Sequence, residues 1–185
     1  GIDSWTYNPV ILELFDSIAV QNAARVVDAV LECFPGLKST ADIGCGGGAF
    51  VAEFQGRGLK AVGFEHSPHG ITLARSRGAE CSYFDVSETE ANPEKVQFDL
   101  AYSFEVAEHL PAALAVDFAR FVAAYSRLVI FSAATPNQGG IGHINEQPIS
   151  YWVDVFQSIG FTLDDSATDS LRAAFVAYSL YTAPG

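Results

Sequence analysis

The stretch ADIGCGGGAF, residues 41–50, decides the fold of this chain. Its first residues belong to an apolar run at 40–43 that predicts a buried strand, and an apolar segment with helical spacing follows it. Gly44, Gly46 and Gly48 stand at the turn between the two. Glycines permit positive φ and let a ligand approach the backbone, while the first N–H groups of a helix are unpaired donors. We therefore expect a nucleotide-type ligand beside this turn.

Working outward from the turn, short apolar runs alternate with amphipathic segments. The runs predict strands at 40–43, 61–64, 81–84, 98–102, 128–131, about 161–163 and 173–181. The amphipathic segments predict helices at 9–34, as one helix or two, and at 50–57, 68–77, 111–125 and 148–159. Strands that alternate with helices form parallel sheets covered on both faces. The fold class expected is α/β, a Rossmann-like, seven-stranded, mostly parallel sheet with helices on both faces.

Length and composition indicate one compact domain. The 185 residues are 49% apolar and only 17% charged, and no linker-like run divides them. We expect a single domain over 1–185, with an N-terminal helical segment at 1–36 and an α/β core at 37–185.

Charge and cysteine usage exclude several classes of function. The net charge is −12 and the basic residues are scattered, which makes nucleic acid an unlikely partner. No uncharged apolar run reaches about 18 residues, so no membrane span is expected, and we predict a cytoplasmic protein. Cys33, Cys45 and Cys81 are odd in number and form no C-x-x-C pair, which predicts free thiols.

Three acidic residues narrow the choice of ligand. The glycine run also satisfies the dinucleotide pattern, and Glu65, after the second strand, suits an adenosine ribose in either case. Asp42 stands where a dinucleotide fold keeps an apolar residue, and Asp85 ends the third strand. Carboxylates repel a pyrophosphate but tolerate the sulfonium and ammonium of S-adenosylmethionine. The acids favour that cofactor over NAD, although Asp42 and Asp85 could also serve as helix caps.

With the block FDLAYSFEVAEHLP at 98–111, these residues make the chain resemble a class I S-adenosylmethionine-dependent methyltransferase over about 39–161. The resemblance implies that the glycine loop holds the methionine moiety, that Glu65 binds the ribose hydroxyls, and that Asp85 with Val86 contacts adenine. The cofactor-binding candidates are Asp42, Gly44, Cys45, Gly46, Gly48, Glu65, His66, Asp85, Val86, Ser103 and Phe104.

The segment EVAEH places Glu105, Glu108 and His109 at i, i+3 and i+4, on one face of a helical turn if one follows the fourth strand. Two carboxylates and an imidazole suit a divalent ion such as Mg²⁺, Mn²⁺ or Zn²⁺, and His143 could supply a fourth ligand. Some methyltransferases with a similar segment hold a metal there. The alternative is that Glu105 flanks the cofactor while the other two brace the helix against a loop.

The long loop at 133–147 offers polar groups where an acceptor would approach. It carries His143, which with Glu105 makes up the candidate catalytic set, His143 as general base. The segment at 140–152 resembles a stretch in class I methyltransferases of saccharide and natural-product pathways. We therefore expect O-methylation of a small-molecule or saccharide hydroxyl. The sequence is also compatible with a homodimer. An NAD-dependent oxidoreductase and a non-catalytic S-adenosylmethionine-binding module are the alternatives.

Overall fold

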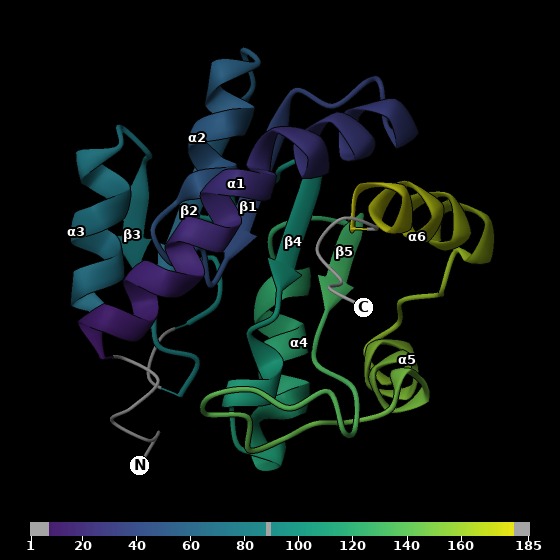
Figure 1. The fold of residues 1–185 in the computed structure, drawn as a ribbon. Coiled ribbons are helices and arrows are strands. Elements are labelled where there is room, and N and C mark those ends of the chain that lie inside the picture. Colours follow the sequence, from purple (N-terminus) through teal and green to yellow (C-terminus); the bar gives the residue numbers. More distant parts are fainter. Residues whose placement is uncertain (1–7, 88–89, 180–185) are drawn as a thin grey trace.

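The structure, a computed structural model, describes residues 8–87 and 90–179, and side chains up to residue 174 (Figure 1). The strands are β1 (Ser39–Ile43), β2 (Lys60–Glu65), β3 (Cys81–Tyr83), β4 (Leu100–Phe104) and β5 (Val129–Ser132). The helices are α1 (Pro9–Cys33), α2 (Ala49–Gly56), α3 (Pro68–Ser76), α4 (Ala115–Ala123), α5 (Ile149–Ser158) and α6 (Asp165–Ser179), with short 3₁₀ turns η1 (Ala107–His109) and η2 (Ala112–Leu114).

The strands form one parallel sheet in the order β3-β2-β1-β4-β5. The order reverses between β1 and β4, because the chain runs outward to β3 and then crosses back to β4 on the other side of β1. In open parallel sheets, ligands bind outside the carboxyl ends of the strands at this reversal. The residues that follow β1 and β4 are Gly44 and Glu105.

Helices cover both faces of the sheet, as predicted (Figure 1). On one face, Val27 of α1 and Phe54 of α2 pack against Leu100 and Tyr102. On the other face, side chains of α4 and α5, such as Phe118, pack against the strand residues whose side chains point the opposite way. The strands are therefore apolar on both sides, which is the usual pattern of a parallel sheet.

Helix starts follow local sequence signals. The Asn8 side chain accepts a hydrogen bond of 2.9 Å from the backbone N–H of Val10, and Pro9 occupies the first position of α1. Ser67 caps α3 in the same way, followed by Pro68. A polar cap followed by proline satisfies an unpaired N–H and presets the helical φ, so both helices begin where the sequence predicts.

Two predicted strands are wrong within the described residues. The stretch 161–164 has no regular structure, and 165–179 forms α6 instead of a strand at 173–181, of which 180–181 lie outside the described residues. An apolar run does not by itself distinguish a strand from a packed helix, and alanines favour the helix. Asp164 caps it, because its carboxylate accepts from the Ala167 N–H at 2.9 Å. The sheet thus has five strands in the described part of the chain, not seven.

Helix α6 lies against α1 through Leu171, which is buried beside Val27 and Val30. The predicted N-terminal segment is a single helix of 25 residues. Within the described ranges, none of these helices is both long enough and apolar enough to span a bilayer.

Candidate active site

A cavity of about 620 Å³ lies at the carboxyl ends of β1, β2 and β4. Its walls come from the loops that follow these strands, from the loop after β5, and from the first half of α1. Most predicted site residues line it: Asp42, Gly44, Cys45, Gly46, Glu65, His66, Asp85, Val86, Phe104, Glu105, Glu108, His109 and His143. The tertiary fold therefore brings together residues spread over about a hundred positions of sequence.

Two predicted residues, Gly48 and Ser103, do not line the cavity. Gly48 precedes α2 with φ +72°, and a Cβ there would lie 2.8 Å from the Ala74 Cβ, so it lets α2 approach α3. The Ser103 hydroxyl is fully buried and donates to the Ile43 carbonyl at 2.8 Å, which ties β4 to β1. Both residues support the shape of the site from behind.

Glu65 holds the glycine loop in place. One carboxylate oxygen accepts from the Gly46 N–H at 2.8 Å, and the other accepts from the Ser67 N–H at 2.7 Å. Each oxygen has a further lone pair, so the carboxylate can still accept from a pair of ligand hydroxyls. Burial raises the pKa of Glu65, and the two N–H donors act against that rise.

Asp42 is buried at the end of β1, and its Oδ2 atom has no hydrogen-bond partner among the described residues. Desolvation by burial raises the pKa of Asp42 well above its ordinary value, an effect to which the nearby Glu65 carboxylate adds. A buried carboxylate with an unpaired oxygen is costly, and a cationic ligand would relieve that cost.

The charge of the cavity is one-sided. Six of its lining residues are acidic, and none of the described lining residues is Lys or Arg: the acids are Asp16, Asp42, Glu65, Asp85, Glu105 and Glu108. Such a wall attracts a cation and repels phosphate groups.

Asp85 and His66 line the edge of the cavity beyond β2 and β3, and Tyr83 lies beside His66. Ser87 donates to Oδ1 of Asp85 through both its N–H (2.8 Å) and its hydroxyl (2.6 Å), and the hydroxyl bond is the main reason that the pKa of Asp85 is lowered. Nδ1 of His66 lies 3.6 Å from Oδ2 of Asp85, and its ring lies 5.5 Å from that of Tyr83, centroid to centroid. This edge of the cavity therefore carries a carboxylate beside an imidazole ring.

Helix α1 closes one side of the cavity. Asp16 forms a two-pronged ion pair with Arg77, with both N–O distances 2.7 Å, and Arg77 also donates to the Gly47 carbonyl. A Cβ on Gly47 would lie 2.0 Å from the Asp16 carboxylate. This contact joins α1, the glycine loop and the end of α3, and no local sequence signal pairs residues so far apart.

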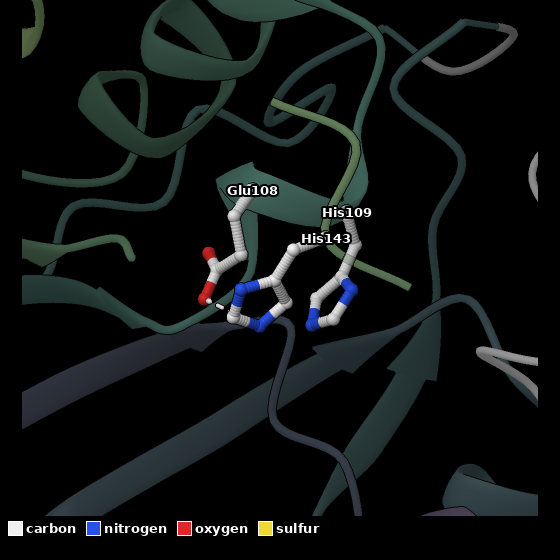
Figure 2. Close-up of side chains that lie close together, drawn as sticks. All are labelled: Glu108, His109 and His143. Atoms are coloured by element: carbon white, nitrogen blue, oxygen red, sulfur yellow. Dashed lines mark ion pairs between the residues drawn. The ribbon is translucent and has the colours of Figure 1, made fainter. Parts of the chain in front are cut away.

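Glu108, His109 and His143 lie together at the wall of the cavity (Figure 2). One ligand-capable atom from each residue lies within 4.8 Å of the others. Glu108 is completely buried, and neither of its carboxylate oxygens has a hydrogen-bond partner in the described ranges. Phe15 of α1 approaches the same group, with its ring centroid 6.5 Å from that of His109.

Hydrogen bonds at the far side of each ring determine which nitrogen faces this group. Nδ1 of His109 lies 3.1 Å from the Gly142 carbonyl, and Nδ1 of His143 lies 3.0 Å from the Glu146 carboxylate. Both partners are acceptors, so each Nδ1 carries the hydrogen and donates it. In the neutral rings, both Nε2 atoms then keep a free lone pair, which is the arrangement found in histidine metal ligands.

Burial shifts the pKa values of two members of this group in opposite directions. Desolvation, aided by the charge of Glu105, raises the pKa of Glu108 from 4.5 to about 7. Desolvation also lowers the pKa of His109, which favours its neutral form. Metal ligands need neutral imidazoles and an ionised carboxylate, so a bound divalent ion would pull the Glu108 pKa back down.

The loop after β5 is anchored to this group. The carbonyl of Glu108 accepts from the Ile144 and Asn145 N–H groups, at 2.9 and 3.0 Å. The Glu146 carboxylate accepts from the N–H groups of Asn137 (3.0 Å) and Gly139 (2.9 Å) as well as from His143. Glu146 therefore fixes the loop and the His143 ring together, a role that was not predicted from its sequence position.

Glu105 lies outside the three-residue group. Its φ is +55°, so the chain turns sharply between β4 and η1, and the predicted shared helical face does not include it. Its two oxygens accept from the Ser132 hydroxyl at 2.8 Å and from the Gln138 amide at 3.3 Å. Glu105 lines the cavity but faces the β5 side.

Comparison with known proteins agrees with this architecture. The family model described as a methyltransferase domain matches residues 18–138, more than half of the chain. An uncharacterised methyltransferase of Mycobacterium sp. strain JLS is 33% identical over 100 residues, covering 52% of this chain and 40% of the relative. A ubiquinone biosynthesis O-methyltransferase of Alkalilimnicola ehrlichii is 31% identical over 110 residues, covering 56% and 42%. The chain thus spans about two fifths of the length of these curated relatives.

Among solved structures, the magnesium protoporphyrin IX methyltransferase of Synechocystis PCC 6803 with bound SAH superimposes with a TM-score of 0.66 at 16% identity. The match covers 80% of this chain and 75% of that one. At this identity the likeness establishes the fold. The chain belongs to the methyltransferase-domain family and has the fold of the class I S-adenosylmethionine-dependent methyltransferases.

Proposed function

We propose that this protein binds S-adenosylmethionine in the cavity and transfers its methyl group to a hydroxyl of a small molecule or saccharide. The observation that carries the proposal is the acidic cavity beside the glycine loop, with six carboxylates, of which Asp16 is paired with Arg77, and neither Lys nor Arg among the described lining residues. A sulfonium and an ammonium are attracted by such a wall, whereas the pyrophosphate of NAD is repelled. The solved relative with bound SAH supports the choice of cofactor.

Each part of the cofactor is assigned to particular residues of the cavity wall. Glu65 accepts from the ribose hydroxyls while it continues to hold Gly46, and Asp42 compensates the positive charge of the amino-acid end. Asp85, with Val86 and the His66 ring, frames the adenine. These assignments follow the positions of the residues around one cavity and the acceptor capacity that each carboxylate retains.

Methyl transfer to oxygen requires in-line displacement, so positioning contributes most of the rate. The hydroxyl must also lose its proton. His143 is the proposed general base, because its Nδ1 is held by Glu146 and its Nε2 keeps a free lone pair at the cavity wall. Glu105, which faces the β5 side of the cavity, is proposed to orient the acceptor through hydrogen bonding.

A divalent ion held by Glu108, His109 and His143 is the second candidate for activating the acceptor. The convergence of three ligand atoms within 4.8 Å, one of them from a buried carboxylate without a hydrogen-bond partner in the described part, favours it. Such an ion lowers the pKa of a bound hydroxyl, which removes the need for a protein base. The two roles of His143 exclude each other, since Nε2 cannot bind a metal and accept a proton together.

The test is calorimetric and chemical. Purified protein is titrated with S-adenosylmethionine and, separately, with NAD, and is then incubated with labelled S-adenosylmethionine and a panel of hydroxylated acceptors. We expect S-adenosylmethionine to bind, NAD to leave the heat unchanged, and label to appear in at least one acceptor. Binding of NAD in preference would overturn the proposal, while binding without transfer to any acceptor would identify a non-catalytic module.

Two observations support the proposed acceptor class. A relative is named as an O-methyltransferase of ubiquinone biosynthesis, and the loop that carries His143 presents amide, imidazole and carboxylate groups suited to hydroxyl-rich ligands. The single domain over 1–185, the cytoplasmic location and the homodimer that the sequence leaves open stay predictions.

A further inference from the structure

Two cysteines from different parts of the fold meet below the cavity. Sγ of Cys45, in the glycine loop after β1, lies 3.5 Å from Sγ of Cys81, the first residue of β3. In the sheet, β2 lies between β1 and β3, so the two thiols meet across a strand to which neither belongs. Both cysteines are buried and present as free thiols.

The residue of β2 that lies between them explains this contact. Gly63 is paired in register with Cys81, and a Cβ on Gly63 would lie only 2.5 Å from the Cys45 sulfur. The φ of Gly63 is not in the left-handed region, so the backbone does not require glycine here. The missing side chain leaves the space that the Cys45 thiol fills on its way to Cys81.

We propose that Cys45 and Cys81 form an intramolecular disulfide on reaction with a hydroperoxide, and that this bond weakens cofactor binding. Cys45 lines the cavity, which is the side from which a small peroxide would approach its sulfur. A disulfide requires the sulfurs to approach to about 2.05 Å from their present 3.5 Å, which side-chain rotation and a small loop shift can supply.

The reaction balances in two steps. The Cys45 sulfur attacks the peroxide, an S–O bond forms as the O–O bond breaks, and the leaving alkoxide takes the Cys45 proton to become an alcohol. The Cys81 sulfur then attacks the Cys45 sulfenic acid, an S–S bond forms as the S–O bond breaks, and the departing hydroxide takes the Cys81 proton to become water. Two thiols lose two electrons and two protons, and one peroxide is reduced.

The surroundings favour Cys81 as the second attacker. The hydrogen bond from the Cys45 thiol lowers the pKa of Cys81, and the charge of Arg75 lowers it further. The same hydrogen bond, together with burial, raises the pKa of Cys45, so the first attack is assigned to Cys45 for its position at the cavity and not for thiolate character. The Arg75 guanidinium is held close by, because it donates to the Cys81 carbonyl at 2.9 and 3.2 Å. A sulfur with more thiolate character attacks a sulfenic acid faster.

The bond would act on the cofactor through the glycine loop. Cys45 stands between Gly44 and Gly46, and the Gly46 N–H is the group that Glu65 holds at 2.8 Å. Drawing Cys45 towards β3 shifts this loop away from the position that lines the cavity. We expect the affinity for S-adenosylmethionine to fall by about tenfold or more, which corresponds to about 1.4 kcal/mol.

Peptide mapping tests the bond itself. Reduced protein is treated with hydrogen peroxide and denatured in the presence of N-ethylmaleimide, which alkylates the remaining free thiols. Trypsin then separates the three cysteines into peptides 26–38, 39–57 and 78–95. We expect a covalent 39–57/78–95 pair that dithiothreitol releases, and an alkylated Cys33 in peptide 26–38. Recovery of Cys45 as a sulfinic acid without the linked pair would overturn the proposal.

Two variants extend the test to binding. Cys33→Ala should still form the linked pair and should lose S-adenosylmethionine affinity after peroxide as the unchanged protein does, whereas Cys81→Ala should not form the pair. The effect on binding rests on the proposed function, but the mapping does not. If reduced protein fails to bind S-adenosylmethionine, the proposed function fails; if the linked pair forms and affinity is unchanged, the regulatory inference fails.

Discussion

Nε2 of His143 lies 3.9 Å from Oε1 of Glu108, although the two residues are 35 positions apart in the chain. Glu108 lies in the 3₁₀ turn after β4, and His143 lies in the loop after β5. The loop reaches the turn because Ile144 and Asn145 donate backbone hydrogen bonds to the Glu108 carbonyl. The distance is too long for a hydrogen bond but suits two ligands of one ion, and His109 completes the group.

His109→Ala separates the two proposed roles of His143. If a metal activates the acceptor, this variant should lose Mn²⁺ binding in calorimetry and lose most of its turnover, because one of three ligands is gone. If His143 is a base without metal, turnover should survive both this change and exhaustive EDTA treatment. His69→Ala is the matched control, because His69 lies in α3 and does not line the cavity.

Glu146→Ala tests the orientation of the His143 ring. The carboxylate holds Nδ1 of His143 and two backbone N–H groups, so its loss should free both the ring and the loop. We expect turnover to fall by roughly 10- to 100-fold, as for other groups that orient a functional histidine. Glu146→Gln, which keeps an acceptor oxygen, should recover part of it. Equal turnover in wild type and Glu146→Ala would contradict the role, and Asp154→Asn, a change at an exposed position of α5, serves as control.

Asp42→Asn tests the electrostatic basis of cofactor binding. The change keeps the size of the side chain but removes the charge of a buried carboxylate beside the glycine loop. We expect the dissociation constant for S-adenosylmethionine to rise by roughly 10- to 100-fold, the range for one charged hydrogen bond. Asp99→Asn is the control, since Asp99 accepts from the Lys38 and Ser39 N–H groups at the start of β1, away from the cavity. Unchanged affinity in Asp42→Asn would remove Asp42 from the site.

The pH dependence of stability should reveal Glu108. Its pKa in the folded state is about 7, raised from 4.5 mainly by desolvation, so folding favours the protonated form. The stability contributed by the neutral carboxyl is therefore present below about pH 4.5 and is lost as the pH rises to about 7. Measured with EDTA present, the melting temperature of wild type should fall relative to that of Glu108→Gln between pH 5 and pH 8. Parallel curves for the two proteins would show that Glu108 is not the group responsible.

Arg77→Ala tests the contact that holds α1 over the cavity. Arg77 pairs with Asp16 at two distances of 2.7 Å, and both side chains are largely shielded from solvent. We expect a loss of roughly 1–3 kcal/mol in the free energy of unfolding. We also expect weaker S-adenosylmethionine binding, because α1 forms one wall of the cavity. Arg120→Ala, which removes an exposed ion pair with Asp117, should change neither quantity.

The alternation of strands and helices was readable from the sequence because each signal is local. Asn8-Pro9 and Ser67-Pro68 begin helices, and the apolar runs of the five strands are bounded by turns. The region after 160 was mispredicted because its apolar run fits a strand or a helix equally well. Packing of Leu171 against α1 favours the helix α6 over a strand, and that contact joins residues that are about 140 positions apart.

Some residues of the candidate site could likewise be predicted from the sequence, and others could not. Asp42, Gly44, Gly46, Glu65 and Asp85 could be predicted, since each follows or ends a strand and the carboxyl ends of parallel strands meet at one edge. Local patterns were therefore enough to predict the fold class, the family and which strand ends carry these residues. The folded chain was needed to reveal the Asp16–Arg77 contact, the contacts of Glu146, the exclusion of Glu105 from the Glu108–His109–His143 group, and the Cys45–Cys81 pair. Each of these contacts depends on which side chains, distant in the sequence, the fold brings within a few ångströms, and a local sequence pattern does not indicate this.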